Sequence, residues 1–284
     1  MSSAITVSGL RKTYGSFVAV DDVDLQVESG EVFAFLGPNG AGKTTTIDIL
    51  TGAQRRTSGT VSVLGRDPQN DEREWRAQVG VVPQGTAKYS DLTVREIIDH
   101  FASFYPDPFP TGQLIDMVGL GAKAKVLSTK LSGGQRRRLD VAVGVVGRPR
   151  LLFLDEPTTG LDPEARREAW ELVRLLTGTG MTTVLTTHYL DEAQELSQRA
   201  GIIVRGRIMH VGTLGELARL TGRRYRVSYD LDPLVEVPLS LAERMKSQPH
   251  SCLYGTDEPT ALLRLLLDAA QRHGIAEIPG LQIT

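Results

Sequence analysis

The sequence offers almost nothing for covalent cross-linking, because it contains one cysteine, Cys252, in 284 residues. One cysteine excludes an intramolecular disulfide, and with it the small disulfide-dense folds of secreted proteins. So low a cysteine content is what we expect of a protein from a reducing compartment. Cys252 itself is expected to be a passive residue rather than a reactive one.

Long apolar stretches are also missing. No run approaches the roughly 20 residues that a membrane-spanning helix needs. The N-terminal string Met1-Ser-Ser-Ala-Ile-Thr-Val lacks the charged start and apolar core of a signal peptide. We therefore expect a cytoplasmic protein whose membrane role, if it has one, comes through a partner.

Neither sign of charge dominates. The 32 Lys and Arg residues nearly balance 34 Asp and Glu, for a formal net charge of -2, so bulk electrostatics give no reason to expect nucleic-acid binding. The local basic run Arg136-Arg137-Arg138 is interpreted as a solvated helix face. With 40% hydrophobic and 23% charged residues, the chain has the composition of a globular protein of one large or two small domains.

Three short strings carry the chemistry that is present. Gly37-Pro-Asn-Gly-Ala-Gly-Lys-Thr44 fits the G-x-x-x-x-G-K-[ST] phosphate loop, whose backbone N–H groups surround nucleotide phosphates. Leu151-Leu-Phe-Leu-Asp-Glu-Pro157 places two acids at the C-terminal end of a buried strand, beside that loop. Between them, Leu131-Ser-Gly-Gly-Gln135 has two glycines that let backbone N–H groups at a helix start approach an anion.

The elements around these strings alternate as in an α/β protein. Strands are predicted at residues 5–7, 18–20, 23–27 and 31–36, followed by a helix over 42–52. A mostly helical insert follows from about 85 to 147, with helices at 94–104, at 114–118 and after Gly134. Strands at 151–154, 182–186 and 202–204 then alternate with helices at 163–176 and 190–197. Residues 222–284 carry no nucleotide motif and are predicted to form a small α+β unit, with strands at 224–229 and 280–283 and a helix at 260–273.

In order and spacing, the three strings resemble those of ABC transporter ATP-binding subunits, in which residues 131–135 would be the signature motif. The resemblance spans about residues 4–220. It implies a P-loop NTPase core of the ABC type with an antiparallel β subdomain and the helical insert, so that residues 1–221 form the ATPase domain and 222–284 a small accessory domain. Arg136-Arg-Arg-Leu-Asp-Val-Ala and Gly147-Arg-Pro149 look most like the ABC-2 type, drug-exporter subgroup.

The resemblance assigns roles residue by residue. Lys43 would neutralise the β- and γ-phosphates, Glu156 would act as general base, and His188 would contact the γ-phosphate and hold the base and its water in place. Mg²⁺ would be held by Thr44, Gln84 and Asp155. The residues expected to contact ATP are Tyr14, which would stack on adenine, and Gly37, Pro38, Asn39, Gly40, Ala41, Gly42, Lys43, Thr44, Thr45, Ser132, Gly133, Gly134, Gln135 and Asp162.

Several of these roles have structural alternatives. Adjacent residues on a regular strand point to opposite faces, so one of Asp155 and Glu156 must lie where the strand is ending, and one of them could simply cap it. His188 near a strand end could be structural. The string 132–135 could be a flexible loop before a helix.

One set of motifs implies a subunit that must pair. The family's solution is a homodimer or heterodimer arranged head to tail, in which the signature string of each subunit closes over the ATP held by the other. We therefore predict an ATPase that drives transport, with export favoured, through a separate polytopic permease at the inner face of the cell membrane. The alternative is a soluble ATP-switched interaction module.

The permease is predicted to dock on the helical insert, near residues 85–106. Apolar and aromatic groups there exceed what a few short helices need, although each could instead be buried in the insert's own core. The residues concerned are Tyr89, Leu92, Phe101, Phe104 and Tyr105.

Overall fold

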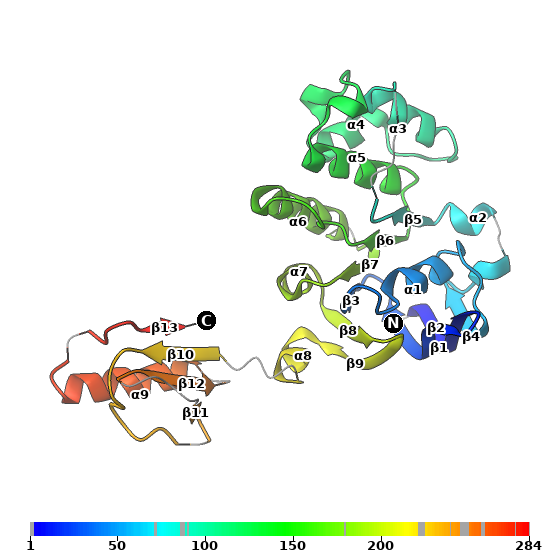
Figure 1. Cartoon of the computed structure of the whole chain (residues 1–284). Coiled ribbons are helices and arrows are strands. Elements are labelled where there is room, and N and C mark those ends of the chain that lie inside the picture. Colours follow the sequence, from blue (N-terminus) through cyan, green and yellow to red (C-terminus); the bar gives the residue numbers. More distant parts are fainter. Residues whose placement is uncertain are drawn as a thin grey trace. The chain divides into compact units, whose positions relative to one another are not determined.

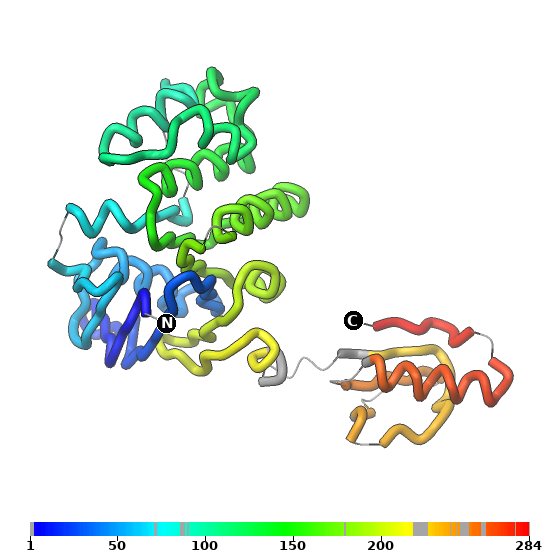
Figure 2. The backbone as a smooth tube through the Cα atoms, turned by 180° about the vertical axis from the view of Figure 1, so that it is seen from behind, coloured from blue at the N-terminus to red at the C-terminus, as the bar shows by residue number. Residues whose placement is uncertain are grey.

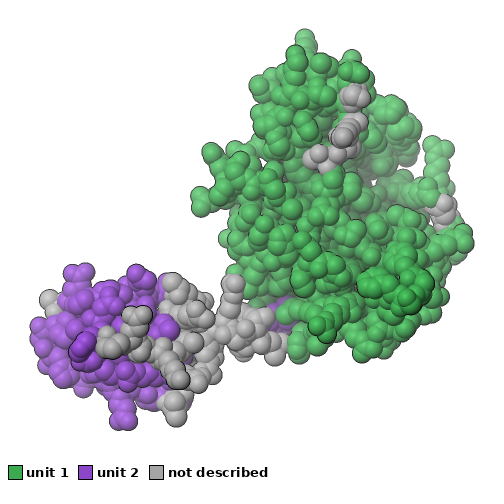
Figure 3. Space-filling model, viewed as in Figure 1, with its two compact units in different colours: residues 1–214 green, residues 215–284 purple. Residues whose placement is uncertain are grey.

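The computed structural model describes residues 3–70, 73–85, 89, 91–178, 180–220, 225–238, 240–244, 250–256, 259–275 and 277–283. The chain forms two compact units, Met1–Leu214 and Gly215–Thr284 (Figure 3). Each unit has a hydrophobic core of its own. None of the helices in the described ranges combines the length and the apolar character that crossing a bilayer requires.

The first unit is built on a six-stranded sheet (Figure 1). In spatial order its strands are β5 (Val79–Val82), β6 (Leu151–Asp155), β7 (Thr182–Thr187), β3 (Val32–Leu36), β8 (Arg199–Val204) and β9 (Arg207–Thr213). The first five are parallel and β9 is antiparallel at the edge. Every residue of β6 and β7 is buried, as expected for central strands of a parallel sheet. The strands predicted at 31–36, 151–154, 182–186 and 202–204 are confirmed, whereas β9 was not predicted.

Because β3, β6 and β7 run parallel and adjacent, their C-terminal ends meet at one edge of the sheet. The segments that follow them there are the phosphate loop, the acidic pair and the His188 segment. α1 (Lys43–Leu50) begins at this edge and packs against β6. α7 (Leu190–Leu196) packs against β3 and β7, and α6 (Pro163–Thr177) contacts α7. The helices predicted at 42–52, 163–176 and 190–197 are thus confirmed.

A separate antiparallel sheet has the order β2-β1-β4, with β1 (Ser3–Tyr14), β2 (Phe17–Glu28) and β4 (Ser58–Val63). The two strands predicted at 18–20 and 23–27 are a single strand, β2. Asp22 accommodates the irregularity between them with a φ of 56°, and the pairing with β1 shifts register between Leu10 and Lys12. A local kink within one strand therefore gives the same sequence pattern as a break between two strands. The backbone N–H of Asp21 donates to Gly206 O at 2.8 Å, which ties this sheet to the β8–β9 turn.

The helical insert lies between β5 and β6 in the chain. It contains α3 (Val94–Ala102), α4 (Thr111–Met117) and α5 (Gly133–Val145), with short 3-10 turns at η2 (Gly121–Lys123) and η3 (Ser128–Lys130). α3 starts with a capping box, in which Thr93 accepts from the backbone of Glu96 and Glu96 accepts from the backbone of Thr93. The predicted insert helices are therefore confirmed. Ahead of the insert, η1 (Pro68–Asn70) and α2 (Arg73–Arg76) connect β4 to β5.

The prediction that the basic run is one solvated face is wrong for its middle residue. The Arg137 side chain is only 5% exposed, whereas Arg138 is partly exposed and pairs with Glu168 on α6. Three consecutive residues on a helix point about 100° apart, so they cannot share one face. The middle one points into the protein.

The second unit is α+β, as predicted. Its four-stranded sheet has the order β11-β12-β10-β13, and both backbone views show α9 (Pro259–Arg272) beside the strands (Figures 1 and 2). The strands are β10 (Tyr225–Tyr229), β11 (Glu243–Arg244), β12 (Cys252–Thr256) and β13 (Gln282–Ile283), and α8 (Leu214–Leu220) precedes them. Cys252 is buried in the core of this unit. Arg224, the first residue of the strand predicted at 224–229, and the predicted domain boundary at 221–222 lie outside the described residues.

Candidate functional site

The phosphate loop joins the end of β3 to the start of α1. Gly42 is the N-cap of α1 and has a φ of 103°, a backbone conformation that side chains disfavour. A Cβ added to Gly42 would lie 2.5 Å from Ala19 O, and one added to Gly37 would lie 2.3 Å from Ile203 O. Both glycines are therefore required for the loop to pass this close to neighbouring backbone.

Lys43 lies inside this loop and is only 4% exposed. Its Nζ donates to Gly37 O at 2.8 Å and to Pro38 O at 3.2 Å, and it lies 3.2 Å from Glu156 Oε1. A buried ammonium needs such partners, because an isolated charge would be strongly disfavoured there. The cation therefore occupies the centre of the loop, where phosphate oxygens are expected.

The two adjacent acids both contact the start of α1, Asp155 through Thr44 and Glu156 through Lys43, and the backbone explains how. β6 ends at Asp155, and Glu156 adopts a left-handed φ of 44°. This turn breaks the strand alternation that would otherwise send the two side chains to opposite faces. Thr44 Oγ1 donates to Asp155 Oδ2 at 3.0 Å. Thr186 Oγ1 donates to Asp155 Oδ1 and accepts from the backbone N–H of Glu156, which links the two acids.

Glu156 collects contacts from four segments of the chain. Gln84 Nε2 donates to its Oε2 at 2.8 Å and Thr159 Oγ1 donates to the same oxygen at 3.0 Å, while His188 Nδ1 lies 3.7 Å from its Oε1. Burial raises the pKa of Glu156, but the hydrogen bonds from Thr159 and Lys43 and the Lys43 charge outweigh it and leave the pKa below its ordinary value. The carboxylate is therefore held ionised, as a proton acceptor must be.

His188 follows β7, the strand that lies between β6 and β3. Its Nδ1 is buried and has no hydrogen-bond partner within the described part of the chain. Its ring lies against Tyr189, with the ring centroids 4.0 Å apart. A buried nitrogen that is aimed at a carboxylate and left without a partner fits a group that bonds to a ligand.

Lys43, Gln84 and Glu156 line a pocket of about 420 Å³. Its lining residues are Phe17, Ala19, Asn39, Gly40, Gly42, Lys43, Thr44, Thr45, Gln84 and Glu156. Phe17 was not predicted, and neither were Thr159 and Thr186 beside the acids. The sequence shows only that a second aromatic residue follows Tyr14 by three positions, and the structure pairs the two across the β1–β2 turn.

Tyr14 is not among the lining residues of this pocket. Its hydroxyl accepts from Gln54 Nε2 at 3.1 Å, and the Lys12 ammonium lies 4.7 Å from its ring centroid. Its ring is 46% exposed, whereas that of Phe17 is 62% exposed. Phe17, and not Tyr14, is thus the aromatic residue that lines this pocket, and stacking of Tyr14 on adenine stays a prediction.

The side chains predicted to hold Mg²⁺ are suited to that ion. Thr44 and Asp155 already share a hydrogen bond, and Gln84 lies at the same pocket, so a hydroxyl, a carboxylate and an amide converge. Mg²⁺ prefers oxygen ligands and keeps several waters, so it needs few protein groups. The phosphate loop likewise fits a nucleoside triphosphate.

The signature segment lies elsewhere. Ser132 is the N-cap of α5 and forms a capping box with Gln135, in which each side chain accepts from the other residue's backbone N–H at 3.2 Å. Neither these residues nor Gly133, Gly134 and Asp162 are among those that line the Lys43 pocket. Asp162 caps α6 by accepting from the backbone N–H groups of Glu164 and Ala165. The predicted ATP contacts therefore fall into two groups within one chain.

Comparisons with known proteins agree with this geometry. The family model for "ABC transporter" matches residues 20–159. The chain is 38% identical over 284 residues to the daunorubicin/doxorubicin resistance ATP-binding protein DrrA of Streptomyces peucetius, covering 95% of this chain and 86% of that protein. It is 37% identical to the Nod factor export ATP-binding protein I of Cupriavidus metallidurans, covering 94% of this chain and 90% of that protein.

Solved structures show the same fold. A structure of an ATP-binding subunit of an ABC transporter superposes with a TM-score of 0.68 at 27% identity, covering 77% of this chain and 93% of that one. A dimeric post-hydrolysis state of an ATP-binding cassette bound to ADP and Pi superposes with a TM-score of 0.66 at 24% identity, covering 74% of this chain and 98% of that one.

Proposed function

Because this chain belongs to the ABC transporter family of ATP-binding proteins, and within it to the export-type ATPases, we propose that it hydrolyses ATP to drive export through a separate membrane permease. The chain would then work at the inner face of the cell membrane, attached through that permease. The observation that supports this most directly is the set of contacts around Glu156.

The arrangement suits attack of water on the γ-phosphate. The oxygen of the water forms a bond to phosphorus while the bond to the β–γ bridging oxygen breaks, and the proton lost by the water passes to the Glu156 carboxylate. Lys43 turns from Glu156 and the loop carbonyls to the phosphate oxygens, and His188 donates to the γ-phosphate. Mg²⁺ held by Thr44, Asp155 and Gln84 would supply further neutralisation of phosphate charge.

The predicted ATP contacts that do not line the Lys43 pocket, Ser132 and Asp162 among them, are explained by a second subunit. Ser132 and Asp162 are separated from the Lys43 pocket within one chain, and Ser132 is exposed at the start of α5. Head-to-tail pairing with another ATPase subunit, identical or related, brings the signature string of each subunit to the ATP of the other. Two ATP molecules are then enclosed per dimer.

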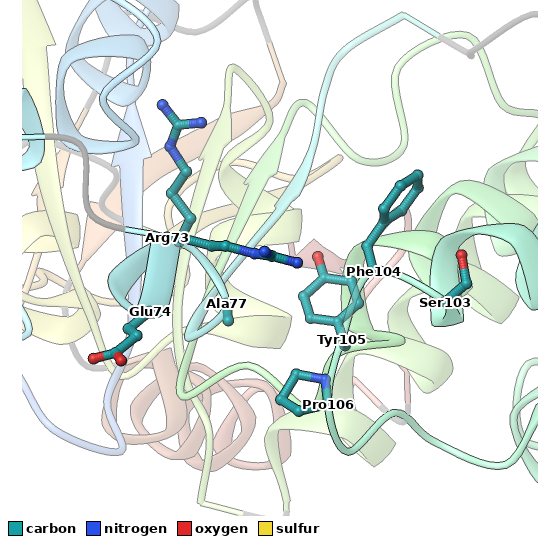
Figure 4. Close-up of a pocket in the computed structure, with 8 residues that line it drawn as sticks. Arg73, Glu74, Ala77, Ser103, Phe104, Tyr105 and Pro106 are labelled. Atoms are coloured by element: carbon teal, nitrogen blue, oxygen red, sulfur yellow. The ribbon is translucent and has the colours of Figure 1, made fainter.

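The permease would dock in a groove between α2 and the end of α3. This groove has a volume of about 540 Å³. One side is lined by Arg73 and Glu74 of α2 and by Ala77, which follows α2, and the other side by Phe104 and Tyr105 (Figure 4). The Phe104 ring is 57% exposed, so an apolar anchor is available without rearrangement. An aromatic surface beside an arginine suits a short amphipathic helix.

The other predicted docking residues are less available. The rings of Tyr89 and Phe101 pack edge to face at 5.7 Å between centroids, so each is partly used inside the insert. Leu92 is 38% exposed but does not line the groove. Residues 86–88 and 90 of the predicted 85–106 segment lie outside the described residues. We therefore propose residues 103–106 and α2 as the docking surface.

Site-specific crosslinking tests this proposal. In a Cys252→Ser background, Phe104→Cys should crosslink to a cytoplasmic segment of the copurified permease. Leu175→Cys on α6 is the matched control, because Leu175 is 56% exposed and does not line the groove. The yield at position 104 should change on addition of MgATP, and that change should disappear in Lys43→Ala.

Equal crosslinking at both positions would contradict the docking surface. Crosslinks to a soluble protein alone would instead favour an ATP-switched interaction module.

A further inference from the structure

Arg137 is buried in α5 and donates to three backbone carbonyls of three different residues. Its Nε donates to Pro157 O at 2.8 Å, its Nη1 to Pro83 O at 2.6 Å and its Nη2 to Asp155 O at 3.0 Å. These bonds use both edges of the planar guanidinium. Arg137 therefore connects α5 to two other chain segments.

Each of these carbonyls adjoins a residue of the hydrolytic site. Asp155 and Pro157 are the residues immediately before and after Glu156, and Pro83 immediately precedes Gln84, whose amide donates to Glu156. The backbone of Glu156 is in the left-handed region, with a φ of 44°. A non-glycine residue in this region persists only when its surroundings hold it there. Arg137 bonds to the chain on both sides of that strained residue.

The surroundings of Arg137 also stabilise its charge. Burial lowers the pKa of the guanidinium, and the nearby carboxylates of Asp140, Asp155 and Glu192 oppose that shift. An arginine stays protonated in proteins even so. Its full charge therefore strengthens the three bonds to carbonyl oxygens.

We propose that Arg137 is a positioning residue for hydrolysis: it holds the Glu156 carboxylate in place and ties it to the signature helix α5. This inference rests on the proposed function. Ser132, the N-cap of α5, would contact the ATP of the partner subunit. If α5 shifts when the two subunits close on ATP, Arg137 transmits that shift to the backbone on both sides of Glu156. The geometry at the base then depends on whether the second subunit is engaged.

No other side chain can make this set of bonds. Lysine keeps the charge but presents it at one point and cannot span three carbonyls in a plane. Glutamine keeps a side-chain amide donor but not the charge. Both variants should leave the phosphate loop intact, because Arg137 does not line the pocket of Lys43.

The test compares Arg137→Gln and Arg137→Lys with Arg138→Gln in the full chain. Arg138 is the next residue of the same helix, and its partner is the exposed Glu168. Hydrogen–deuterium exchange is measured over residues 153–159, with β8 (residues 199–204) of the same sheet as an internal control for folding of the first unit. MgATP affinity is measured with a fluorescent ATP analogue, and kcat and KM are measured with the permease present.

We expect faster exchange over residues 153–159 in Arg137→Gln, and a smaller increase in Arg137→Lys. Turnover should fall by about 100-fold in Arg137→Gln, the size of effect that a displacement of about 1 Å at a reacting group produces. MgATP affinity should stay at the wild-type value, and Arg138→Gln should behave as wild type.

The inference is overturned if exchange over residues 153–159 matches that of Arg138→Gln, if kcat is unchanged, or if affinity falls in proportion to kcat. If Arg137→Gln does not fold, Arg137→Lys decides by the same measurements. Absence of MgATP turnover in the wild-type chain would overturn the proposed function instead. The exchange comparison would still decide whether Arg137 holds this segment.

Discussion

At the residue scale, the site depends on the unusual backbone of Glu156. Its left-handed φ of 44° carries a strain of about 1–3 kcal/mol. That strain is offset by bonds to the Glu156 backbone and carboxylate from Thr186, Gln84 and Thr159. Burial raises the pKa of this carboxyl, and the bond from Thr159 is one of the interactions that lower it below its ordinary value. A base at this position can therefore be adjusted by changing a neighbour that never touches ATP.

Thr159→Ala should shift the pH dependence of turnover. The Thr159 hydroxyl donates to Glu156 Oε2 and is one cause of the lowered pKa of that carboxyl. Removing it raises the pKa of Glu156. A general base works only when ionised, so activity is lost as the pH falls through its pKa, and the acid limb of kcat should move to higher pH. The measurement is a pH–rate profile of MgATP hydrolysis.

Thr177→Ala is the control for that profile. Its hydroxyl bonds to Arg174 O at the end of α6 and has no contact with Glu156. Its acid limb should coincide with that of wild type. Coincident limbs for Thr159→Ala and Thr177→Ala would show that Thr159 does not influence the base.

At the scale of elements, two helices of the insert begin with the same device. Thr93 with Glu96 caps α3, and Ser132 with Gln135 caps α5. Both caps satisfy backbone N–H groups that a helix start leaves unpaired. Only the second cap is also proposed to contact ATP. This chain therefore contains an internal control for separating a structural role of Ser132 from a catalytic one.

Ser132→Ala and Thr93→Ala should each lower the free energy of unfolding by about 1 kcal/mol, the usual effect of losing such a cap. Thermal unfolding measures this loss. MgATP affinity of the isolated chain should stay unchanged in both variants, because neither residue lines the Lys43 pocket. Steady-state turnover should fall in Ser132→Ala only. An equal loss of turnover in both variants would mean that Ser132 acts through helix stability alone.

At the scale of the whole molecule, one chain carries all the predicted ATP contacts, but only some of them line the Lys43 pocket. The Lys43 pocket lies at the C-terminal ends of β3 and β6, whereas Ser132 and Asp162 begin α5 and α6. The second unit has its own sheet and its own core. Because Ser132 and Asp162 do not line the Lys43 pocket, completion of the predicted ATP site is expected to depend on association with another subunit.

Glu156→Gln should bind MgATP, hydrolyse it very slowly and accumulate as a dimer. The amide keeps the volume of the side chain but cannot accept the proton of the attacking water. Gel filtration with MgATP should show a dimer that wild type shows only weakly. Adding Lys43→Ala should abolish it, because the triphosphate loses its main protein cation. A Glu156→Gln chain that binds MgATP yet stays monomeric at high concentration would contradict the closed dimer.

The motifs and most elements could be predicted from the sequence by itself. The phosphate loop needs Gly37 and Gly42 because of local backbone geometry, and buried parallel strands are nearly continuous apolar runs. Such signals are contained within a few consecutive residues. They are enough to predict the α/β core, the helical insert, Lys43 in its loop and the acidic pair at the end of β6.

Only the tertiary structure decided which distant residues meet. Phe17 at the pocket, Thr186 between the two acids and the burial of Arg137 each depend on contacts between segments far apart in the chain. The predicted strands at 18–20 and 23–27 join into β2 because β1 pairs with both. The sequence of three consecutive arginines predicts exposed side chains, because it does not show which side of the helix packs against the rest of the protein. Packing of α5 against the loops before Gln84 and around Glu156 turned the middle arginine inward, and that contact exists only once the chain has folded.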